Sequence, residues 1–337
     1  MSDTRTHHEA TASGARAAEP AATSAADSVR PALATRHRRG GSQLERRSAR
    51  LGWLLSLPAL LVVAGVLLFP IVYSVAMSFS HVQVTGDGVK LSGVTTDNYQ
   101  VLFAADRWRH ALFFTVLYTV VTVAVEMVLG TAIALVLERL KTGRGWMMAL
   151  LLMPWAIVTV ISAELWAYIY NGVYGVLNSV LQPLLGHDTN VLGTPLQAAG
   201  AMAVADVWKT TPFVAIIVLA GLVMLPGDIV EAARVDGARA WTVFWRVRLP
   251  LLRPTLAIAV MFRILQAFGL FDLPYVLTNG GPGTSTESLA VLGYRVLFND
   301  LKFGPGAAVA TTSAALVLIG CLAFLKVFRA QVGQEEN

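Results

Sequence analysis

Six long apolar stretches most constrain how this chain can fold. Each holds roughly 20 residues or more, the length that a helix needs to cross the hydrocarbon core of a bilayer. Only 14% of the 337 residues are charged, whereas a soluble domain averages about 25%. The sequence therefore predicts an all-α polytopic membrane protein with six transmembrane helices. These cover approximately residues 53–79, 111–137, 146–170, 198–224, 256–278 and 307–328.

The two ends of the chain differ from the apolar body at residues 51–329. Residues 1–50 are rich in Ala, Ser and Thr before a basic run, and so little apolar surface predicts a disordered basic tail. The first apolar stretch is longer than a signal-peptide core of about 7–15 residues, so we expect it to remain as a span. Residues 330–337 form a second short tail. The single cysteine, Cys321, can form no intrachain disulfide.

Lysine and arginine are distributed unevenly between the two sides of the predicted spans. If the N-terminus is cytoplasmic, the inside segments hold the basic tail and three further basic groups, while the outside segment 171–197 holds none. This bias predicts that both termini are cytoplasmic. The net charge of +5 then reflects membrane topology and gives no indication of nucleic-acid binding. The three groups are Arg139, Lys141 and Arg144; Arg234, Arg239, Arg246, Arg248 and Arg253; and Lys326 and Arg329.

A charged segment, EAARVDGARAWTVFWRVRLP at residues 231–250, separates the fourth and fifth apolar stretches. We expect Asp228 to cap a short helix whose first turn also contains Glu231. Gly237 ends this helix and permits a positive φ. The paired alanines at 232–233 would let another protein approach closely, so this first half suits a protein groove better than a lipid surface.

The second half of the charged segment predicts another short helix, over about residues 239–247. Trp241, Phe244 and Trp245 share one face of it by their spacing. Such a face suits a membrane interface about as well as a partner protein. Pro250 and Pro254 mark the start of the fifth span.

The charged segment resembles the EAA signature of permease subunits of binding-protein-dependent ATP-binding-cassette (ABC) importers. The signature is Glu-Ala-Ala, three residues, Gly, nine residues, an aliphatic residue, one residue and Leu-Pro; Val247 stands where Ile is commoner. The resemblance implies a type I ABC importer permease fold, in which this segment is the coupling helix that sits in a groove of a separate ATPase. It singles out Glu231, Ala232, Ala233, Asp236 and Gly237 as the ATPase-coupling residues.

Three further stretches resemble the carbohydrate-uptake branch of these importers, and specifically its maltose-permease-F-like half. They are NYQVLF at 98–103, VWKTTPF at 207–213 and FGLFDLPYVLTNGGPGTSTESL at 268–289. VWKTTPF and YVLTNGG particularly resemble the actinobacterial trehalose-importer permease. The resemblance covers roughly residues 53–329 and implies a bacterial plasma-membrane importer of a sugar, such as trehalose.

The same resemblance implies the partners. They are a second, homologous permease subunit, an ATPase dimer and an extracytoplasmic substrate-binding lipoprotein. The sequence has no GxxxxGK[ST] loop, so we expect this chain to bind no nucleotide. ATP and Mg²⁺ would lie on the partner ATPase, and this chain would be a transport subunit rather than an enzyme.

Charged and polar side chains interrupt the apolar stretches, where they usually face a cavity or a partner because their insertion is costly. Asp206 and Lys209 are either an ion pair on one helix or transport residues. Glu126 is a candidate for a hydrogen bond to another helix. Arg263 and Asp272 lie near opposite ends of the fifth span, where their side chains could extend to the two membrane–water interfaces.

A sugar site needs hydrogen-bonding groups and aromatic faces. Five residues near the fourth and fifth spans provide both, in the region where the resemblance places the sugar pocket. These candidate substrate-binding residues are Lys209, Thr210, Phe213, Gln266 and Phe268.

Two other classes of protein remain possible from the residues alone. An ion-coupled secondary transporter would use Glu126, Asp206 and Lys209 as its relay, although the chain shows no convincing internal repeat. A membrane-embedded glycosyl-transfer enzyme would need paired acidic groups near an interface, and the short loops show no such spacing.

Overall fold

The protein is represented by a computed structural model that describes residues 43–86, 88–185 and 190–333. Most of the two predicted tails, residues 1–42 and 334–337, therefore lies outside the described residues, whereas residues 330–333 continue the helix α14. The chain divides into two compact units, residues 1–62 and 63–337. Of the first unit, the structure describes the helix α1 (Gln43–Val63). This helix begins within the predicted tail, because residues 43–50 are mostly good helix formers that extend the apolar helix.

The second unit is almost entirely helical. Its only strands within the described residues form one antiparallel hairpin. Its elements are η1 (Ala64–Leu68), α2 (Phe69–Ser78), β1 (Ser80–Thr85), β2 (Gly88–Val94), α3 (Asp97–Ala104), α4 (Asp106–Arg139), α5 (Arg144–Ala156), α6 (Thr159–Ile169), α7 (Val176–Leu185), α8 (Pro195–Val223), α9 (Gly227–Val235), α10 (Ala240–Val243), η2 (Phe244–Arg248), α11 (Leu249–Phe268), α12 (Asp272–Val276), α13 (Leu289–Tyr294), η3 (Arg295–Asn299) and α14 (Phe303–Gly333), where η marks a π-helical segment.

The described part of the chain contains five helices that are long and apolar enough to cross a membrane, or six if the bent pair α5–α6 is one span. The all-α polytopic fold predicted from the six apolar stretches is confirmed. The helices of the spans are Leu51–Ser78, Asp106–Arg139, Arg144–Ala156 with Thr159–Ile169, Pro195–Val223, Ala240–Val276 and Phe303–Lys326.

The third span is not one straight helix, contrary to the sequence prediction. Helices α5 and α6 meet at an angle of 87°. Pro154, in the last turn of α5, has no N–H to donate to the preceding turn, and Ile157 and Val158 are extended. A break at this point leaves main-chain carbonyls inside the membrane, where they need other partners.

The fifth span also differs from its prediction. The short helix expected over about residues 239–247 is not separate from the span, because α10, η2 and α11 follow one another without a gap. Pro250 therefore lies inside a continuous helix, just after η2, and this π-helical bulge adjoins the point where proline removes a helical hydrogen bond.

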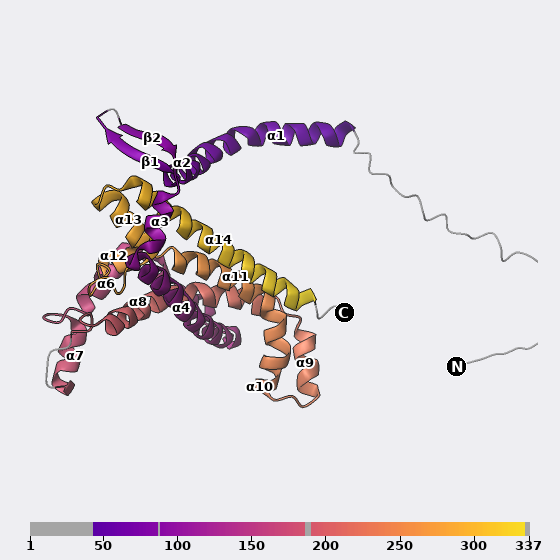
Figure 1. Ribbon diagram of the computed structural model, residues 1–337. Helices are drawn as coiled ribbons and strands as arrows, with labels where there is room; N and C mark the ends of the chain where they lie inside the picture. The colour runs from indigo at the N-terminus through magenta and orange to yellow at the C-terminus, as the bar shows by residue number, and fades with distance from the viewer. Residues whose placement is uncertain (1–42, 87, 186–189, 334–337) are drawn as a thin grey trace, which may run out of the picture. The chain divides into compact units, whose positions relative to one another are not determined.

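Helices α4 and α8 form the centre of the second unit, and α11 packs against both. The contact between α4 and α8 depends on Gly130, since a Cβ there would lie 2.6 Å from Cγ1 of Val214. Fully buried apolar side chains from α8 and α11, including Val218 and Leu252, complete this core. In Figure 1, α9 and α10 project together beyond the adjoining ends of α8 and α11.

Candidate functional site

Helix α9 and the turn that follows it carry all five predicted coupling residues. Val230 is buried, whereas Ile229 and Val235 are 45% and 87% exposed. Glu231, Ala232 and Asp236 are also exposed, and Ala233 is half-buried. The helix therefore presents a small-residue surface with two apolar side chains and two acids, as a surface for another protein requires.

The start of α9 differs in detail from the prediction. Pro226 occupies the N-cap position, with no side-chain hydrogen bond, and Asp228 lies inside the first turn. Asp228 therefore acts only through the favourable interaction of an acid with the positive end of the helix dipole. Glu231 lies one turn further on, where that interaction is weaker.

The end of α9 matches the expectation for Gly237, whose φ is +80°. The N–H of Ala238 donates to the carbonyl of Ala233 at 3.0 Å, and that of Gly237 donates to the carbonyl of Arg234 at 3.0 Å. This pair of bonds is a Schellman motif, which needs a left-handed residue after the helix. The turn directs the chain back into α10 beside α9.

The aromatic residues of α10 and η2 contact one another, as their spacing predicts. The ring centroids of Trp241 and Trp245 are 5.5 Å apart, and those of Phe244 and Trp245 are 5.3 Å apart. Trp241 remains 71% exposed and Trp245 47% exposed. The aromatic face is therefore available to lipid or to another protein.

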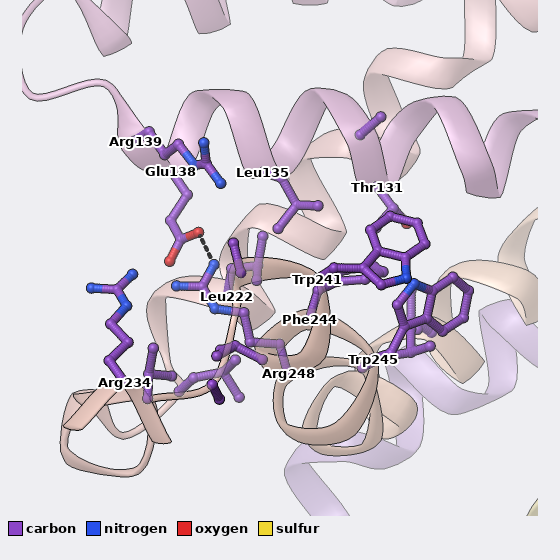
Figure 2. A pocket seen from close by; sticks show the side chains of 18 of the residues that line it. Thr131, Leu135, Glu138, Arg139, Leu222, Arg234, Trp241, Phe244, Trp245 and Arg248 are labelled. Atoms are coloured by element: carbon purple, nitrogen blue, oxygen red, sulfur yellow. Dashed lines mark hydrogen bonds and ion pairs between the residues drawn. The ribbon is translucent and has the colours of Figure 1, made fainter. Parts of the chain in front are cut away.

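A cavity of about 1050 Å³ lies between the second half of α4 and the segment from α9 to η2; we call it the α4–α10 groove. Figure 2 shows Thr131 and Leu135 of α4 on one side and the Trp241 and Phe244 rings on the other. Across it, Nη1 of Arg248 donates to Oε2 of Glu138 at 2.6 Å. This ion pair ties the projecting segment to α4.

A buried charge cluster joins α4, α8 and α11 inside the membrane-spanning region. Arg263 is 2% exposed and Glu126 is fully buried. The Arg263 guanidinium forms two hydrogen bonds with the Glu126 carboxylate, from Nε to Oε2 and from Nη2 to Oε1, the latter at 2.8 Å. Asp206 Oδ2 lies 3.5 Å from the same Nη2. The expectation that Glu126 bonds across helices is confirmed.

Two interpretations of the charged residues in this cluster are wrong. Asp206 pairs with Arg263 of another helix and not with Lys209 of its own. Arg263 does not extend to an interface, because two buried carboxylates hold it at the centre of the helical packing. Two acids and one arginine leave one formal negative charge, and the Thr210 hydroxyl donates a further hydrogen bond to the Glu126 carboxylate.

The predicted sugar-binding residues do not form one group. Thr210 donates to Glu126 Oε1 at 2.6 Å, and Gln266 Oε1 accepts from Arg263 Nη1 at 3.0 Å, so both belong to the charge cluster. Phe213 stacks on Trp155 with ring centroids 5.7 Å apart. Phe268 packs instead against the separate apolar core that includes Leu102 and Trp108.

Lys209 has a structural environment that its sequence neighbours do not indicate. Its Nζ donates to the main-chain carbonyls of Ile157 and of Trp155, the latter at 3.3 Å. These carbonyls lie at the break between α5 and α6. Lys209 therefore supplies the hydrogen bonds that the bent span lacks, and its positive charge suits the negative C-terminal end of α5.

A second charge network, which the sequence analysis missed, ties the segment after α12 to two helices. The carboxylate of the fully buried Glu287 accepts two bonds from Arg107 at 2.7 Å and one from Arg295 at 2.8 Å. Arg295 also donates to the carbonyl of Asn279 at 2.8 Å. The sequence signal that could have found this network is the presence of Arg107 and Arg295 on the predicted outer side, where basic residues are few.

Residues 53–331 match the family described as binding-protein-dependent transport system inner membrane component. The chain is 41% identical over 289 residues to the trehalose/maltose transport system permease protein MalF of Thermococcus litoralis, covering 86% of this chain and 97% of that one. It is 36% identical over 302 residues to the trehalose transport system permease protein SugA of Mycobacterium tuberculosis, covering 89% and 95%.

Among solved structures, the fold resembles a chain of a bacterial ABC transporter involved in the import of the acidic polysaccharide alginate. The TM-score is 0.71 at 21% sequence identity, and the match covers 86% of this chain and 99% of that chain.

Proposed function

This chain belongs to the family of binding-protein-dependent transport system inner membrane components, and we propose that it forms one half of the membrane pathway of an ATP-driven disaccharide importer. It is a transport component and not an enzyme. Trehalose is the substrate we favour, because it appears in the names of two relatives that match nearly their whole length.

The observation that carries the proposal is the surface of α9. The helix leaves Val235 and Ile229 exposed outside the spans, next to Glu231 and Ala232 of the Glu-Ala-Ala signature. A short projecting helix with small, apolar and acidic side chains on its exposed surface suits a groove of another protein. We assign that role to the ATPase, which holds ATP and Mg²⁺, so that closure of the ATPase dimer moves α9 and, through the Arg248–Glu138 ion pair, α4.

The rest of the assembly follows from the same arrangement. A second, homologous permease completes the pathway, and an extracytoplasmic binding lipoprotein delivers the sugar. The Lys/Arg bias places α9 and both termini in the cytoplasm. The two permeases then alternate between inward-open and outward-open states by rigid-body movement.

The sugar path on this chain is formed by the aromatic surface near the break between α5 and α6. Trp155 and Phe262 are 43% and 48% exposed on either side of Phe213, and Gln266 is exposed one turn after Phe262. Aromatic faces beside an amide suit the C–H surface and the hydroxyls of a sugar. Lys209 is a support for this surface and not a sugar ligand.

The ion-coupled alternative is not supported. The family and the relatives are permeases of ABC importers, and two residues of the supposed relay, Glu126 and Asp206, are held by Arg263. Lys209 is bonded to main-chain carbonyls. A relay residue needs access to water on one side, whereas Glu126 is fully buried.

A paired labelling experiment tests the orientation and the ATPase contact together. In a Cys321→Ser background, single cysteines replace Val235 in α9 and, as the matched control, Val94 in the hairpin; these valines are 87% and 91% exposed. A membrane-impermeant maleimide should label the cysteine at 94 in intact cells and the one at 235 only in inverted vesicles. Adding the ATPase should protect position 235 alone. Labelling of position 235 from outside, or no protection of it by the ATPase, would overturn the proposal.

A further inference from the structure

The α4–α10 groove has a cationic end and an aromatic end. Neither the ATPase contact nor the sugar path explains this arrangement. Its volume of about 1050 Å³ is at the upper end of the range for small-molecule sites. Its walls are largely apolar, with Leu135 and Leu222 in the middle.

One end of the groove is cationic. Arg139 of α4 and Arg234 of α9 line it from opposite walls, with Arg248 between them (Figure 2). Glu138 neutralises Arg248 in the ion pair described above. Arg139 and Arg234 form no ion pair or hydrogen bond with any other described side chain, and the remaining acid of the lining is the exposed Glu231.

The other end of the groove is aromatic. Trp241 and Trp245 lie beside Thr131, away from the arginines (Figure 2). Thr131 is eight residues before Arg139 on α4, about 12 Å along the helix at 1.5 Å per residue. Because α4 crosses the membrane and ends at Arg139, the arginines lie at the surface and the tryptophans lie deeper, at the depth where indole rings gather.

We propose that the α4–α10 groove binds one anionic glycerophospholipid of the surrounding membrane. The phosphate lies between Arg139 and Arg234, and an acyl chain runs past Leu135 toward Trp241 and Trp245. The order of groups along the groove, cationic and then apolar and aromatic, matches the order of groups in the lipid. Basic pockets between helices on the cytoplasmic side bind anionic headgroups by the same chemistry.

The bound lipid would bridge α4 and α9, because Arg139 and Arg234 belong to those two helices. It would thereby reinforce the Arg248–Glu138 ion pair, which joins the projecting segment to α4. The assignment to the cytoplasmic leaflet rests on the proposed orientation, but the site itself does not depend on sugar transport.

Tryptophan quenching in nanodiscs tests the proposal on the purified full chain. The probes are dibrominated phosphatidylglycerol and dibrominated phosphatidylcholine at equal mole fraction. The quenching of Trp241 and Trp245 is obtained as the difference in fluorescence quenching between the native chain and the Trp241→Phe/Trp245→Phe variant. The anionic probe should quench these residues more strongly. Arg139→Gln/Arg234→Gln should weaken its apparent affinity about thirtyfold, at about 1 kcal/mol for each arginine.

The matched control is Arg239→Gln/Arg246→Gln, which removes the same charge from exposed positions on the same segment outside the groove. It should retain the preference for the anionic probe. Equal quenching by both probes, or equal losses in the two double variants, would overturn the site. Loss of the anionic preference on assembly with the ATPase and the second permease would also overturn it, by showing that a protein subunit occupies the groove. No transport is measured, so these outcomes are independent of the proposed import function.

Discussion

Replacing Arg263 by Met should destabilise the protein more than any other single arginine substitution in its spans. The guanidinium pairs with Glu126 and Asp206, and none of the three side chains is more than 6% exposed. Removing it leaves two carboxylates in the membrane interior with no cation between them. Removing one partner of a buried ion pair costs about 3–5 kcal/mol.

The whole cluster can be removed at a smaller cost than the arginine alone. The triple variant Glu126→Gln/Asp206→Asn/Arg263→Met leaves no charge to compensate, and the amide at 126 still accepts the hydrogen bond from Thr210. The large cost of breaking a buried ion pair comes from the charge that is left uncompensated, and the triple variant leaves none. The triple variant should therefore recover most of the stability that Arg263→Met loses.

The measurement is the melting temperature of the purified chain in detergent. Arg263→Met should lower it by on the order of 10 °C, from the expected loss and the usual shift for a chain of this size. The matched control is Arg109→Met, which removes an arginine whose ion pair with Asp106 has side chains 60% and 95% exposed. Its loss should cost at most about 1 kcal/mol, because the ion pair is solvent-exposed. Equal shifts for the two arginines, or a triple variant as unstable as Arg263→Met, would refute this explanation of the cluster.

Three further predictions concern the turn after α9, the bent span and the sugar path. Gly237→Val should abolish ATP hydrolysis stimulated by the binding protein while the chain still inserts, because a β-branched residue rarely adopts a positive φ; normal stimulation would contradict the role of the turn. Lys209→Met should lower the melting temperature, because it leaves two main-chain carbonyls unpaired at a cost of about 1–3 kcal/mol. Lys209→Arg should recover part of the lost stability. An unchanged melting temperature in Lys209→Met would contradict the role of Lys209 as a support for the bent span. Phe213→Ala and Gln266→Ala should each reduce sugar uptake without loss of assembly. The loss for Gln266→Ala should be partial, since one hydrogen bond to a neutral group contributes about 0.5–1.5 kcal/mol. Normal uptake by both variants would place the sugar path elsewhere.

The number and character of the spans could be predicted because hydropathy is a local property. Each apolar stretch must satisfy its own backbone hydrogen bonds in lipid, so its helical state does not depend on its neighbours. The turn at Gly237 could be predicted for the same reason, since a helix end depends on a few consecutive residues.

The partners of the intramembrane charges could not be predicted, since each pair joins different helices. Arg263 lies 137 residues from Glu126, and Lys209 lies 52 residues from Ile157, whose carbonyl it binds. Spacing along one helix suggested an Asp206–Lys209 pair, but helix packing placed the guanidinium of Arg263 beside Asp206 instead. The break between α5 and α6 was missed for a related reason, because hydropathy is the same for a straight helix and a bent pair.

The most direct test of the central claim is sugar uptake with a partner ATPase that cannot hydrolyse ATP. The complete complex, with the second permease and the binding protein, is reconstituted in vesicles containing labelled trehalose outside and ATP on the side of α9. The native ATPase should support concentrative uptake, and the inactive ATPase should reduce it to the level of vesicles without the complex, even when a proton or sodium gradient is applied. Concentrative uptake that persists with the inactive ATPase would contradict the proposed ATP-driven import.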